Sequence, residues 1–327
     1  MLERPVLGTF VGATALVLLA ACGGVAASPL PALAPVAGSQ RLGDVAPKSK
    51  YVYVADRTRE RLLVYPAYQN DPAPIRTLGA AQGIVEIGGV AVDEQGHVFV
   101  ANGSGADVLE FTSGAAQLVR KYTHSLSHPV NVAVAKNGTV DVVDQDDHYP
   151  YGVNSSIVEF RKETNRVETI VLDPNPNLYP LHGVAVDPRG KVWSSPSQTG
   201  DLWPPPSSDC SMPAQNQVYD FVFPTLIIQI TLTKNTQVWG MAIDRGVIYA
   251  ADYCGSVQKY AYDGWKSLGA VAHSGHKPFY VTASRDHLIL IPCAGSGEEG
   301  YVTVTSDAGY ATIRRGLRGP IGAAAGP

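Results

Sequence analysis

The sequence predicts an all-β protein that folds as a six-bladed β-propeller of four-stranded antiparallel blades. A hairpin pattern recurs along the chain, further β-rich segments follow each copy, and the copies start roughly 40 to 57 residues apart, a period typical of propeller blades. Radial closure lets each blade bury both faces against its neighbours. The repetition is therefore a packing requirement of the predicted fold.

Each copy of the hairpin pattern consists of an alternating apolar strand, a turn rich in Asp, Gly, Asn or Arg, and a second β-rich strand. The copies are GVAVDEQGHVFVAN (89–102), VAVAKNGTVDVVDQ (132–145), GVAVDPRGKVWSSP (183–196), GMAIDRGVIYAADY (240–253) and YVTASRDHLILIPC (280–293). We interpret each copy as the first and second strands of one blade.

The remaining strands of each blade follow the hairpin. Third strands are predicted at 107–111, 156–160, 217–221, 256–260 and 301–304, and fourth strands in segments such as QLVRKY, RVETIVL and LIIQITL. A further unit opens the domain, in which YVYVADRTRERLLVYPA supplies a second and a third strand and PIRTL a fourth. Its inner strand is not evident. We expect it either from residues before Tyr51 or from the last strand, near 310–314.

The N-terminal segment has the pattern of an export signal, with an apolar run from Val6 to Ala21 that ends in LAAC at Cys22. LAAC resembles a bacterial lipobox. The alternative, an uncleaved membrane anchor, is disfavoured because about 16 apolar residues are fewer than the roughly 20 that a span needs. The expected organisation is a lipoprotein signal peptide at 1–21, a Gly/Ala/Pro-rich flexible tether at 22–49, the propeller at 50–314 and a flexible C-terminal tail at 315–327.

These features predict an exported lipoprotein, with palmitate or another lipid on Cys22, at the bacterial cell membrane or outer membrane and facing the periplasm or exterior. The chain has 25 Lys and Arg against 29 Asp and Glu, a formal charge of −4. Because the chain has no excess of basic residues, we expect no nucleic-acid partner. We expect contact with the membrane only through the lipid.

Three further cysteines, Cys210, Cys254 and Cys293, leave one thiol over if a single pair is oxidised. The sequence does not select the pair. One hypothesis is that Cys210 bonds to Cys254 or Cys293 and holds the loop at 194–216 over the channel mouth, and the alternative is a lone buried thiol. No two cysteines stand at a zinc-ligand spacing.

Long segments at 144–155, 194–216 and 292–300 are expected on the face where the inner strands begin, opposite the tight turns. At that face the candidate ligand-binding residues are Asn131, His182, Trp239, Tyr280, Asp252 and Trp203. They are expected either to form a polar and aromatic pocket or to plug the channel around ordered water. Asp252 has the alternative role of capping a turn.

Asp144, Asp146 and Asp147, followed by His148, form the densest group of metal-ligand types in the chain. Several carboxylates close together suit Ca²⁺, but this run lacks the Gly and the terminal acid of an EF-hand loop. A solvated acidic loop is the favoured interpretation, with a divalent cation such as Ca²⁺ as the alternative. No other cofactor is expected.

The repeated pattern of Gly, apolar, Ala, apolar, Asp, then Gly and an aromatic residue resembles the NHL repeat and the six-bladed propellers of the gluconolactonase and strictosidine-synthase-like group. LLVYPAYQNDPAPIRTL is similar to the opening of exported bacterial propeller lipoproteins of that kind. The resemblance covers about Tyr51 to Arg314. It implies a divalent metal held by Glu, Asn and Asp, for which Glu86, Asn131 and Asp252 are the matching types.

The motifs that surround those metal ligands in gluconolactonases are not visible in this chain, and no GxSxG elbow is present. The sequence therefore predicts a module that binds a protein or a small molecule at the cell envelope. The alternative is a metal-dependent lactonase or lyase-like hydrolase. A third hypothesis is a scaffolding role in envelope assembly.

Overall fold

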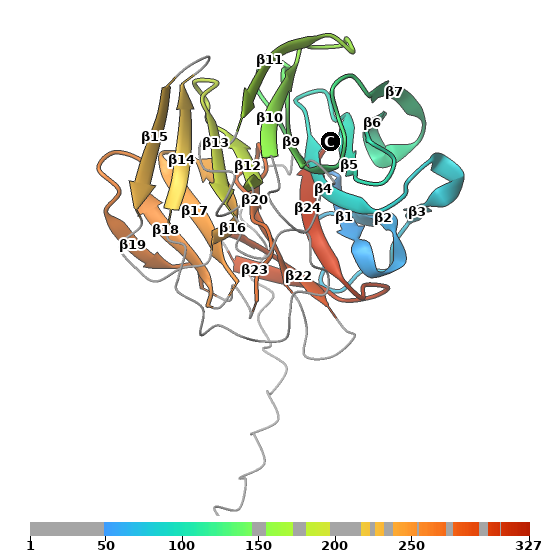
Figure 1. Cartoon of the computed structure of the whole chain (residues 1–327). Coiled ribbons are helices and arrows are strands. Elements are labelled where there is room, and N and C mark those ends of the chain that lie inside the picture. The colour runs from blue at the N-terminus through green and yellow to red at the C-terminus, as the bar shows by residue number, and fades with distance from the viewer. Residues whose placement is uncertain are drawn as a thin grey trace, which may run out of the picture. The chain divides into compact units, whose positions relative to one another are not determined.

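The fold is a six-bladed propeller, as the repeats predict. The computed structural model describes residues 49–145, 155–172, 181–196, 217–222, 226–231, 238–253, 255–272, 277–293, 300–307 and 309–327. These residues form six four-stranded sheets in which every neighbouring pair of strands is antiparallel (Figure 1). The innermost strands of the sheets contact one another in sequence around a central axis, and the last contacts the first.

The strands of each blade are given from the axis outward. Blade 1 contains β24 (Pro320–Gly326), β1 (Tyr51–Asp56), β2 (Arg61–Pro66) and β3 (Arg76–Leu78). Blade 2 contains β4 (Ile87–Val92), β5 (Val98–Asn102), β6 (Asp107–Phe111) and β7 (Leu118–Tyr122). Blade 3 contains β8 (Pro129–Val134), β9 (Val140–Gln145), β10 (Ser155–Phe160) and β11 (Val167–Leu172).

Blade 4 contains β12 (Leu181–Val186), β13 (Val192–Pro196), β14 (Gln217–Val222) and β15 (Leu226–Thr231). Blade 5 contains β16 (Val238–Asp244), β17 (Val247–Asp252), β18 (Val257–Ala261) and β19 (Ser267–Ala270). Blade 6 contains β20 (Thr282–Ala283), β21 (Ile289–Cys293), β22 (Tyr301–Ser306) and β23 (Gly309–Ile313). Short 3₁₀ turns lie at Arg57–Arg59, Ala80–Gln82 and Ser113–Ala115.

The inner strand of blade 1 comes from the C-terminal end of the chain. Residues 320–326 pair antiparallel with β1, from Tyr51 opposite Gly326 to Asp56 opposite Pro320 (Figure 1). The expectation of a flexible tail at 315–327 is therefore wrong for β24, which is buried along its whole length. Both proposed sources of the missing strand are also wrong, because the segment near 310–314 is β23, the outer strand of blade 6.

The repeated glycine is required where the inner strands converge. A Cβ on Gly240 would lie 2.7 Å from the Cα of Tyr280, and one on Gly183 would lie 2.9 Å from the Cα of Gly240. Such contacts are shorter than any real Cβ allows. The same position carries Gly89 and Gly322 in two other blades, where a Cβ would lie 3.2 Å from the Cα of Asn131 and of Gly89 respectively.

The repeated aspartate closes the turn between the first and second strands. One oxygen of Asp93 accepts backbone N–H groups of Gln95 at 2.9 Å and His97 at 2.7 Å. Asp187 accepts in the same way from Arg189 at 2.8 Å and Lys191 at 2.9 Å. These aspartates hold an Asx-type turn, which is why the residue recurs. We call the face formed by these turns the turn face.

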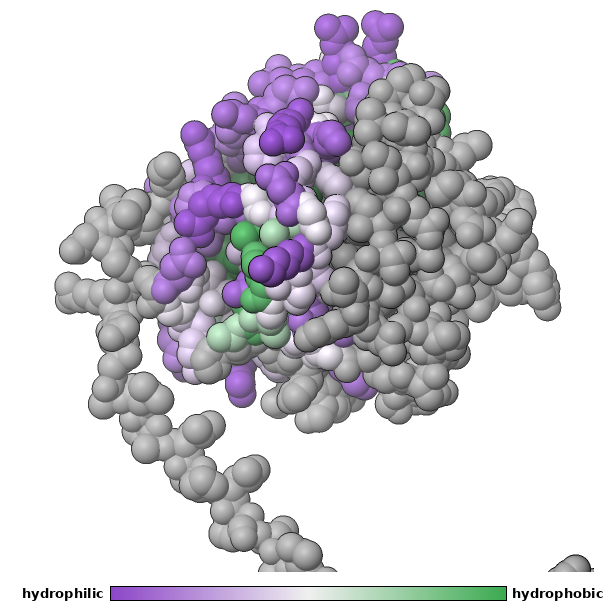
Figure 2. All heavy atoms as spheres, turned by 90° about the vertical axis from the view of Figure 1, so that its left-hand side faces the viewer, coloured by the Kyte–Doolittle hydropathy of each residue, from purple (hydrophilic) through white to green (hydrophobic). Residues whose placement is uncertain are grey.

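The core lies between blades. One apolar cluster joins the facing sides of blades 2 and 3, with Phe99, Tyr122 and Phe160 at its centre. The outer surface seen in Figure 2 carries mostly hydrophilic side chains around a small hydrophobic area. Within the described ranges no helix is long and apolar enough to cross a membrane.

Candidate functional site

Three of the predicted ligand-binding residues meet at the start of the inner strands. The hydroxyl of Tyr280 lies 2.7 Å from Nδ1 of His182, and the His182 ring centre lies 5.2 Å from that of Trp239. These side chains come from blades 4, 5 and 6 and are all buried. They contact one another across the blade interfaces and form the centre of an aromatic cluster.

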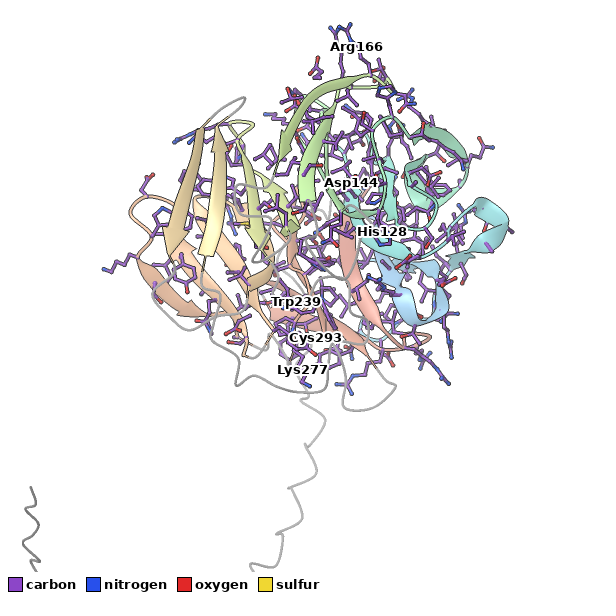
Figure 3. The ribbon with its side chains drawn as sticks, viewed as in Figure 1. His128, Asp144, Arg166, Trp239, Lys277 and Cys293 are labelled. Carbon is purple, nitrogen blue, oxygen red and sulfur yellow. The ribbon has the colours of Figure 1, made fainter. Side chains whose placement is uncertain are left out.

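Two further aromatic residues, which were not among the predicted ligand-binding residues, extend this cluster. Tyr253 stacks on Trp239 with 4.8 Å between ring centres, and Phe279 meets both rings edge-on or tilted. The ammonium of Lys277 lies 5.7 Å from the Tyr253 ring centre (Figure 3). Tyr253 is the last residue of the copy at 240–253 and Phe279 directly precedes the copy at 280–293, which is the signal that could have identified them.

The other predicted residues have local partners. Asn131 is buried, and its side-chain oxygen accepts the N–H of Val132 at 2.8 Å. Asp252 is buried at the end of β17. Asp144 accepts N–H groups of Ser127 at 3.0 Å and His128 at 2.8 Å. Asp146, Asp147 and Trp203 lie outside the described residues.

Within the described part of the chain, no three His, Cys, Asp or Glu side chains form a group that could hold a metal ion. The three metal-ligand types that the resemblance implied are Glu86, Asn131 and Asp252. Asn131 accepts the N–H of Val132, Asp252 is buried at the end of β17, and Glu86 pairs with Arg57. The described residues therefore offer no assembled cation site, although Asp146 and Asp147 fall outside them.

Glu86 is the centre of a polar cluster on the same face as the aromatic residues. Its carboxylate accepts Arg57 Nη2 at 2.8 Å and the hydroxyl of Ser104, and it lies 3.6 Å from Nε2 of His128. The backbone of Glu86 is left-handed, with φ of 59°. Such a conformation costs free energy and often occurs at functional sites. The cluster joins blades 1, 2 and 3.

Cys293 is fully buried and is not part of a disulfide bond. A bond between Cys210 and Cys293 is therefore not part of this structure. The remaining candidate pair, Cys210 with Cys254, and the predicted lipidation site Cys22 lie outside the described residues. Cys293 matches the alternative of a lone buried thiol.

Burial raises the pKa of the Cys293 thiol to about 12. Only about one molecule in ten thousand then carries the reactive thiolate at pH 8. We expect iodoacetamide to leave Cys293 unmodified in the folded protein and to modify it fully in denaturant, as read by mass mapping of its peptide. Rapid modification of Cys293 under native conditions would contradict its placement.

A cavity of about 700 Å³ lies on the propeller axis. Its walls are the inner strands of all six blades, and it extends to the turn face, where Glu94, Lys136, Pro188 and Arg285 line it. Lys50 and Pro327, near the two ends of the described chain, also lie at this mouth. The aromatic cluster is not part of its lining. The cavity therefore occupies the opposite end of the axis from the predicted ligand-binding residues.

The wall of the cavity is formed by strand edges and small side chains. Each inner strand is the edge of its sheet and pairs on one side only, so its backbone edge faces the axis. Unpaired strand edges present N–H and C=O groups in alternation. The residues that line the wall include one alanine from each blade, namely Ala91, Ala133, Ala185, Ala242, Ala283 and Ala324.

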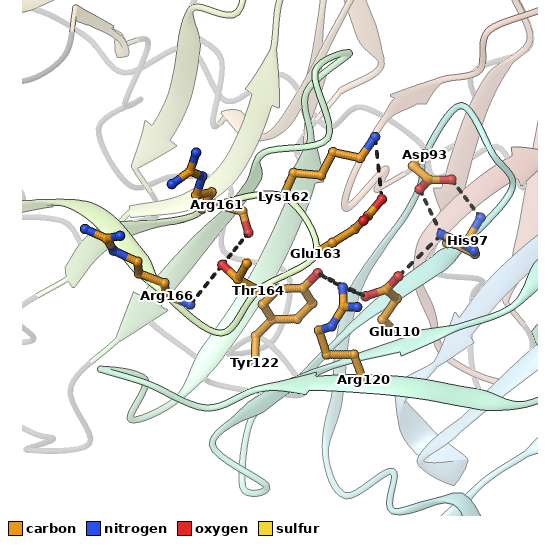
Figure 4. Close-up of polar contacts among 10 residues, drawn as sticks. All are labelled: Asp93, His97, Glu110, Arg120, Tyr122, Arg161, Lys162, Glu163, Thr164 and Arg166. Atoms are coloured by element: carbon orange, nitrogen blue, oxygen red, sulfur yellow. Dashed lines mark hydrogen bonds and ion pairs between the residues drawn. The ribbon is translucent and has the colours of Figure 1, made fainter.

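The rim of the cavity is braced by a polar network in blade 2. Nδ1 of His97 lies 3.1 Å from Asp93 and 3.3 Å from Glu110, and Glu110 also contacts Arg120 Nη1 at 3.1 Å and the Tyr122 hydroxyl at 3.0 Å (Figure 4). Burial, together with the Glu110 carboxylate, raises the pKa of Tyr122 to about 12. Tyr122 therefore remains a donor at neutral pH and links the rim to β7.

The first described residue is fixed to blade 6 at the turn face. Asp286 accepts the N–H of Ser49 at 3.0 Å and its hydroxyl at 2.8 Å, and it also accepts the hydroxyls of Tyr68 and Ser284. Burial alone would raise the pKa of Asp286, but these hydrogen bonds outweigh it and hold the pKa below its usual value. The contact holds Ser49 at the turn face.

Because the folded pKa of Asp286 is depressed, its stabilisation is complete above the unfolded value of about 3.9 and is lost as pH falls through the folded pKa. We expect Asp286→Asn to lower the free energy of unfolding by about 1–2 kcal/mol at pH 7, allowing for solvent screening. Urea titrations at several pH values should show this difference shrinking toward pH 2. A constant difference would contradict the assignment.

Comparison with known proteins supports the fold alone. No family model and no curated protein matches the chain. A structure described as a nidogen/laminin complex matches with a TM-score of 0.59 and 12% identity, covering 85% of this chain and 98% of that one. Hydrazine synthase of Kuenenia stuttgartiensis matches with a TM-score of 0.56 and 15% identity, covering 84% and 82%.

A streptogramin B lyase structure matches with a TM-score of 0.51 and 8% identity, covering 76% of this chain and 74% of that one. The fold and the cavity thus define a class, the β-propellers with an axial cavity. At these identities the likeness extends to the fold and no further. Membership of the NHL or gluconolactonase groups is not established by any of these matches.

Proposed function

We propose that the protein is a binding module whose axial cavity takes a small molecule through the turn face. The observation that carries the proposal is the cavity of about 700 Å³, which falls in the size range of small-molecule sites. Its alternating backbone donors and acceptors suit a ligand with several polar groups, and its alanines leave space for apolar parts. Rigid strands hold these groups in place before binding.

Ala91 offers a way to fill the cavity. It lies on β4, lines the wall and packs against the apolar cluster between blades 2 and 3, where an indole has no room, so the side chain of Ala91→Trp would extend into the space. We expect fragments that raise the melting temperature of the wild-type full chain to lose that effect in Ala91→Trp. The matched control is Val119→Trp on β7, where the side chain is 46% exposed. A screen in which stabilising fragments act equally on all three proteins would rule out the cavity as the site.

Export and lipid anchoring form the second part of the proposal, and they rest on the LAAC segment that ends at Cys22. Ser49 lies at the mouth of the cavity, so a tether from Cys22 would join the propeller on the turn face. Labelled palmitate should be incorporated by the wild-type chain in bacterial cells and not by Cys22→Ser. Equal incorporation would exclude Cys22 as the lipidation site.

A metal-dependent lactonase or lyase-like hydrolase is the second candidate. The cluster of Glu86, Arg57, Ser104 and His128 favours it, because a carboxylate beside an imidazole is a common arrangement for acid–base chemistry. Elemental analysis of the purified protein tests this candidate. A stoichiometric divalent metal whose chelation lowers the melting temperature would support it. A metal-free protein whose melting temperature does not change with chelator would contradict it and favour the binding module.

A further inference from the structure

A second cluster of aromatic side chains lies on the turn face, where blades 4 and 5 meet. Trp193 of β13 packs against two residues of the β18–β19 hairpin. Its ring centre is 5.3 Å from that of Trp265 and 5.7 Å from that of Tyr262, the latter edge-on. Trp193 is buried, whereas Tyr262 and Trp265 are half-buried. We call Trp193, Tyr262 and Trp265 the aromatic shelf.

The turn that carries the shelf is unfavourable for a tryptophan. Gly264 has φ of 80° and Trp265 has φ of 56°, which is the mirror-image turn that Asn and Gly prefer. A left-handed backbone at a residue with a side chain costs about 1 kcal/mol. Trp265 is therefore placed against local preference, and the result is a second indole set beside Trp193.

The surroundings of the shelf are open and positively charged. A Cβ added at Gly190, Gly246 or Gly264 would meet no atom of the described part of the chain within 4 Å. The guanidinium of Arg189 is exposed and lies 5.6 Å from the centre of the Tyr262 ring.

Charge on the two turns favours an anion. The turns at 187–191 and 262–266 carry Arg189, Lys191 and Lys266 against one exposed carboxylate, Asp263. The other acidic side chain, Asp187, is buried and accepts the hydroxyl of Tyr262 and two backbone N–H groups.

The indole N–H of Trp193 supplies an independent observation. Trp193 is only 3% exposed, and its Nε1 has no hydrogen-bond partner among the described residues. Leaving a buried donor unpaired costs free energy and is uncommon in a site used only for packing.

From these observations we propose that the aromatic shelf binds an acidic carbohydrate. The apolar C–H face of a sugar ring stacks on aromatic side chains, as these half-buried rings permit. A sugar carboxylate matches the planar donor fork of a guanidinium, which Arg189 presents at the edge of the shelf. This site is separate from the cavity wall and goes beyond the proposed function.

The test uses intrinsic tryptophan fluorescence of the full chain, because two of its four tryptophans stand in the shelf. The probe is a tetramer of galacturonic acid, with maltotetraose as the neutral comparison. We expect saturable binding of the acidic tetramer with a Kd below about 1 mM, and at least about tenfold weaker binding of the neutral one. Equal binding of both, or no saturation by either, would overturn the proposal.

Two variants test whether the acidic tetramer binds at the aromatic shelf. Trp265→Leu should weaken binding of the acidic tetramer at least about tenfold, and Arg189→Ala about fivefold. Arg189 is exposed, so its removal leaves the fold intact even if Trp265→Leu does not.

Arg166→Ala is the matched control, since Arg166 is an exposed arginine in the β10–β11 turn of blade 3, at the upper end of Figure 3. The cavity variant Ala91→Trp should bind the tetramer normally. Unchanged affinity in Arg189→Ala, or equal loss in Arg166→Ala, would contradict the assignment.

Discussion

Removal of residues 320–327 should abolish folding of the propeller. β24 closes the ring, because it pairs with β1 along its length and packs between β4 of blade 2 and the strands of blade 6. Its loss would expose the inner face of β1 and open the ring on both sides. The expected loss is the whole free energy of unfolding, which is about 5–15 kcal/mol for a typical domain. We expect no cooperative thermal transition by circular dichroism.

A point substitution tests the same closure with less disruption. Ala323 is fully buried, and Ala323→Asp would place an unpaired carboxylate between blades 1 and 6 at a cost of about 3 kcal/mol or more. The control is Val119→Ala on the exposed side of β7, which should change stability by no more than about 0.5 kcal/mol. A truncated protein that unfolds like the wild type would refute closure by β24.

Gly240→Ala should cause a large loss of stability for a change of a single methyl group. The added Cβ would lie 2.6 Å from Cδ1 and 2.7 Å from Cα of Tyr280, so two inner strands would have to separate. Overpacking of this kind costs about 2–3 kcal/mol. Chemical denaturation monitored by fluorescence of Trp239, the preceding residue, would measure it.

Gly190→Ala is the comparison that separates crowding from backbone conformation. Gly190 has φ of 83°, and a Cβ there would meet nothing within 4 Å. Gly190→Ala should therefore lower the free energy of unfolding only by the cost of placing alanine in a left-handed backbone, about 1 kcal/mol. If the two substitutions cost the same, close approach of the inner strands is not the reason for the repeated glycine.

The hairpins were predictable from sequence because their signals are local. The segment 89–102 forms β4 and β5, and the turn between them is made by the Asp and Gly of the motif. Alternation and turn chemistry act over a few residues and do not depend on distant contacts. The same reasoning identified the second, third and fourth strands of blade 1.

β24 was missed because its sequence, PIGAAAG, contains only one β-branched residue and no aromatic one. Glycine and alanine there looked like a linker, whereas the slot between β1 and β4 admits only small side chains. A Cβ on Gly322 would lie 3.2 Å from the Cα of Gly89. Pairing with β1 and close packing against β4 determine that these residues form a strand, and no local sequence pattern indicates those contacts.

The candidate site was predicted only in part. His182, Trp239 and Tyr280 do come together, since equivalent positions of a repeat meet around the axis. The cavity at the turn face was not predicted, because loop length pointed to the opposite face. Its wall is made of backbone edges and alanines, which carry no sequence signal of binding.

The central claim is that the axial cavity is reached through the turn face, and cysteine accessibility tests it most directly. Asn131 and Ala133 lie two residues apart on β8; Asn131 is buried outside the cavity lining, and Ala133 belongs to the cavity wall. Each is replaced by cysteine in the full chain, treated briefly with a maleimide, and read by peptide mapping. The account predicts rapid modification of Ala133→Cys and none of Asn131→Cys. Modification of Asn131→Cys at the same or a higher rate would contradict it.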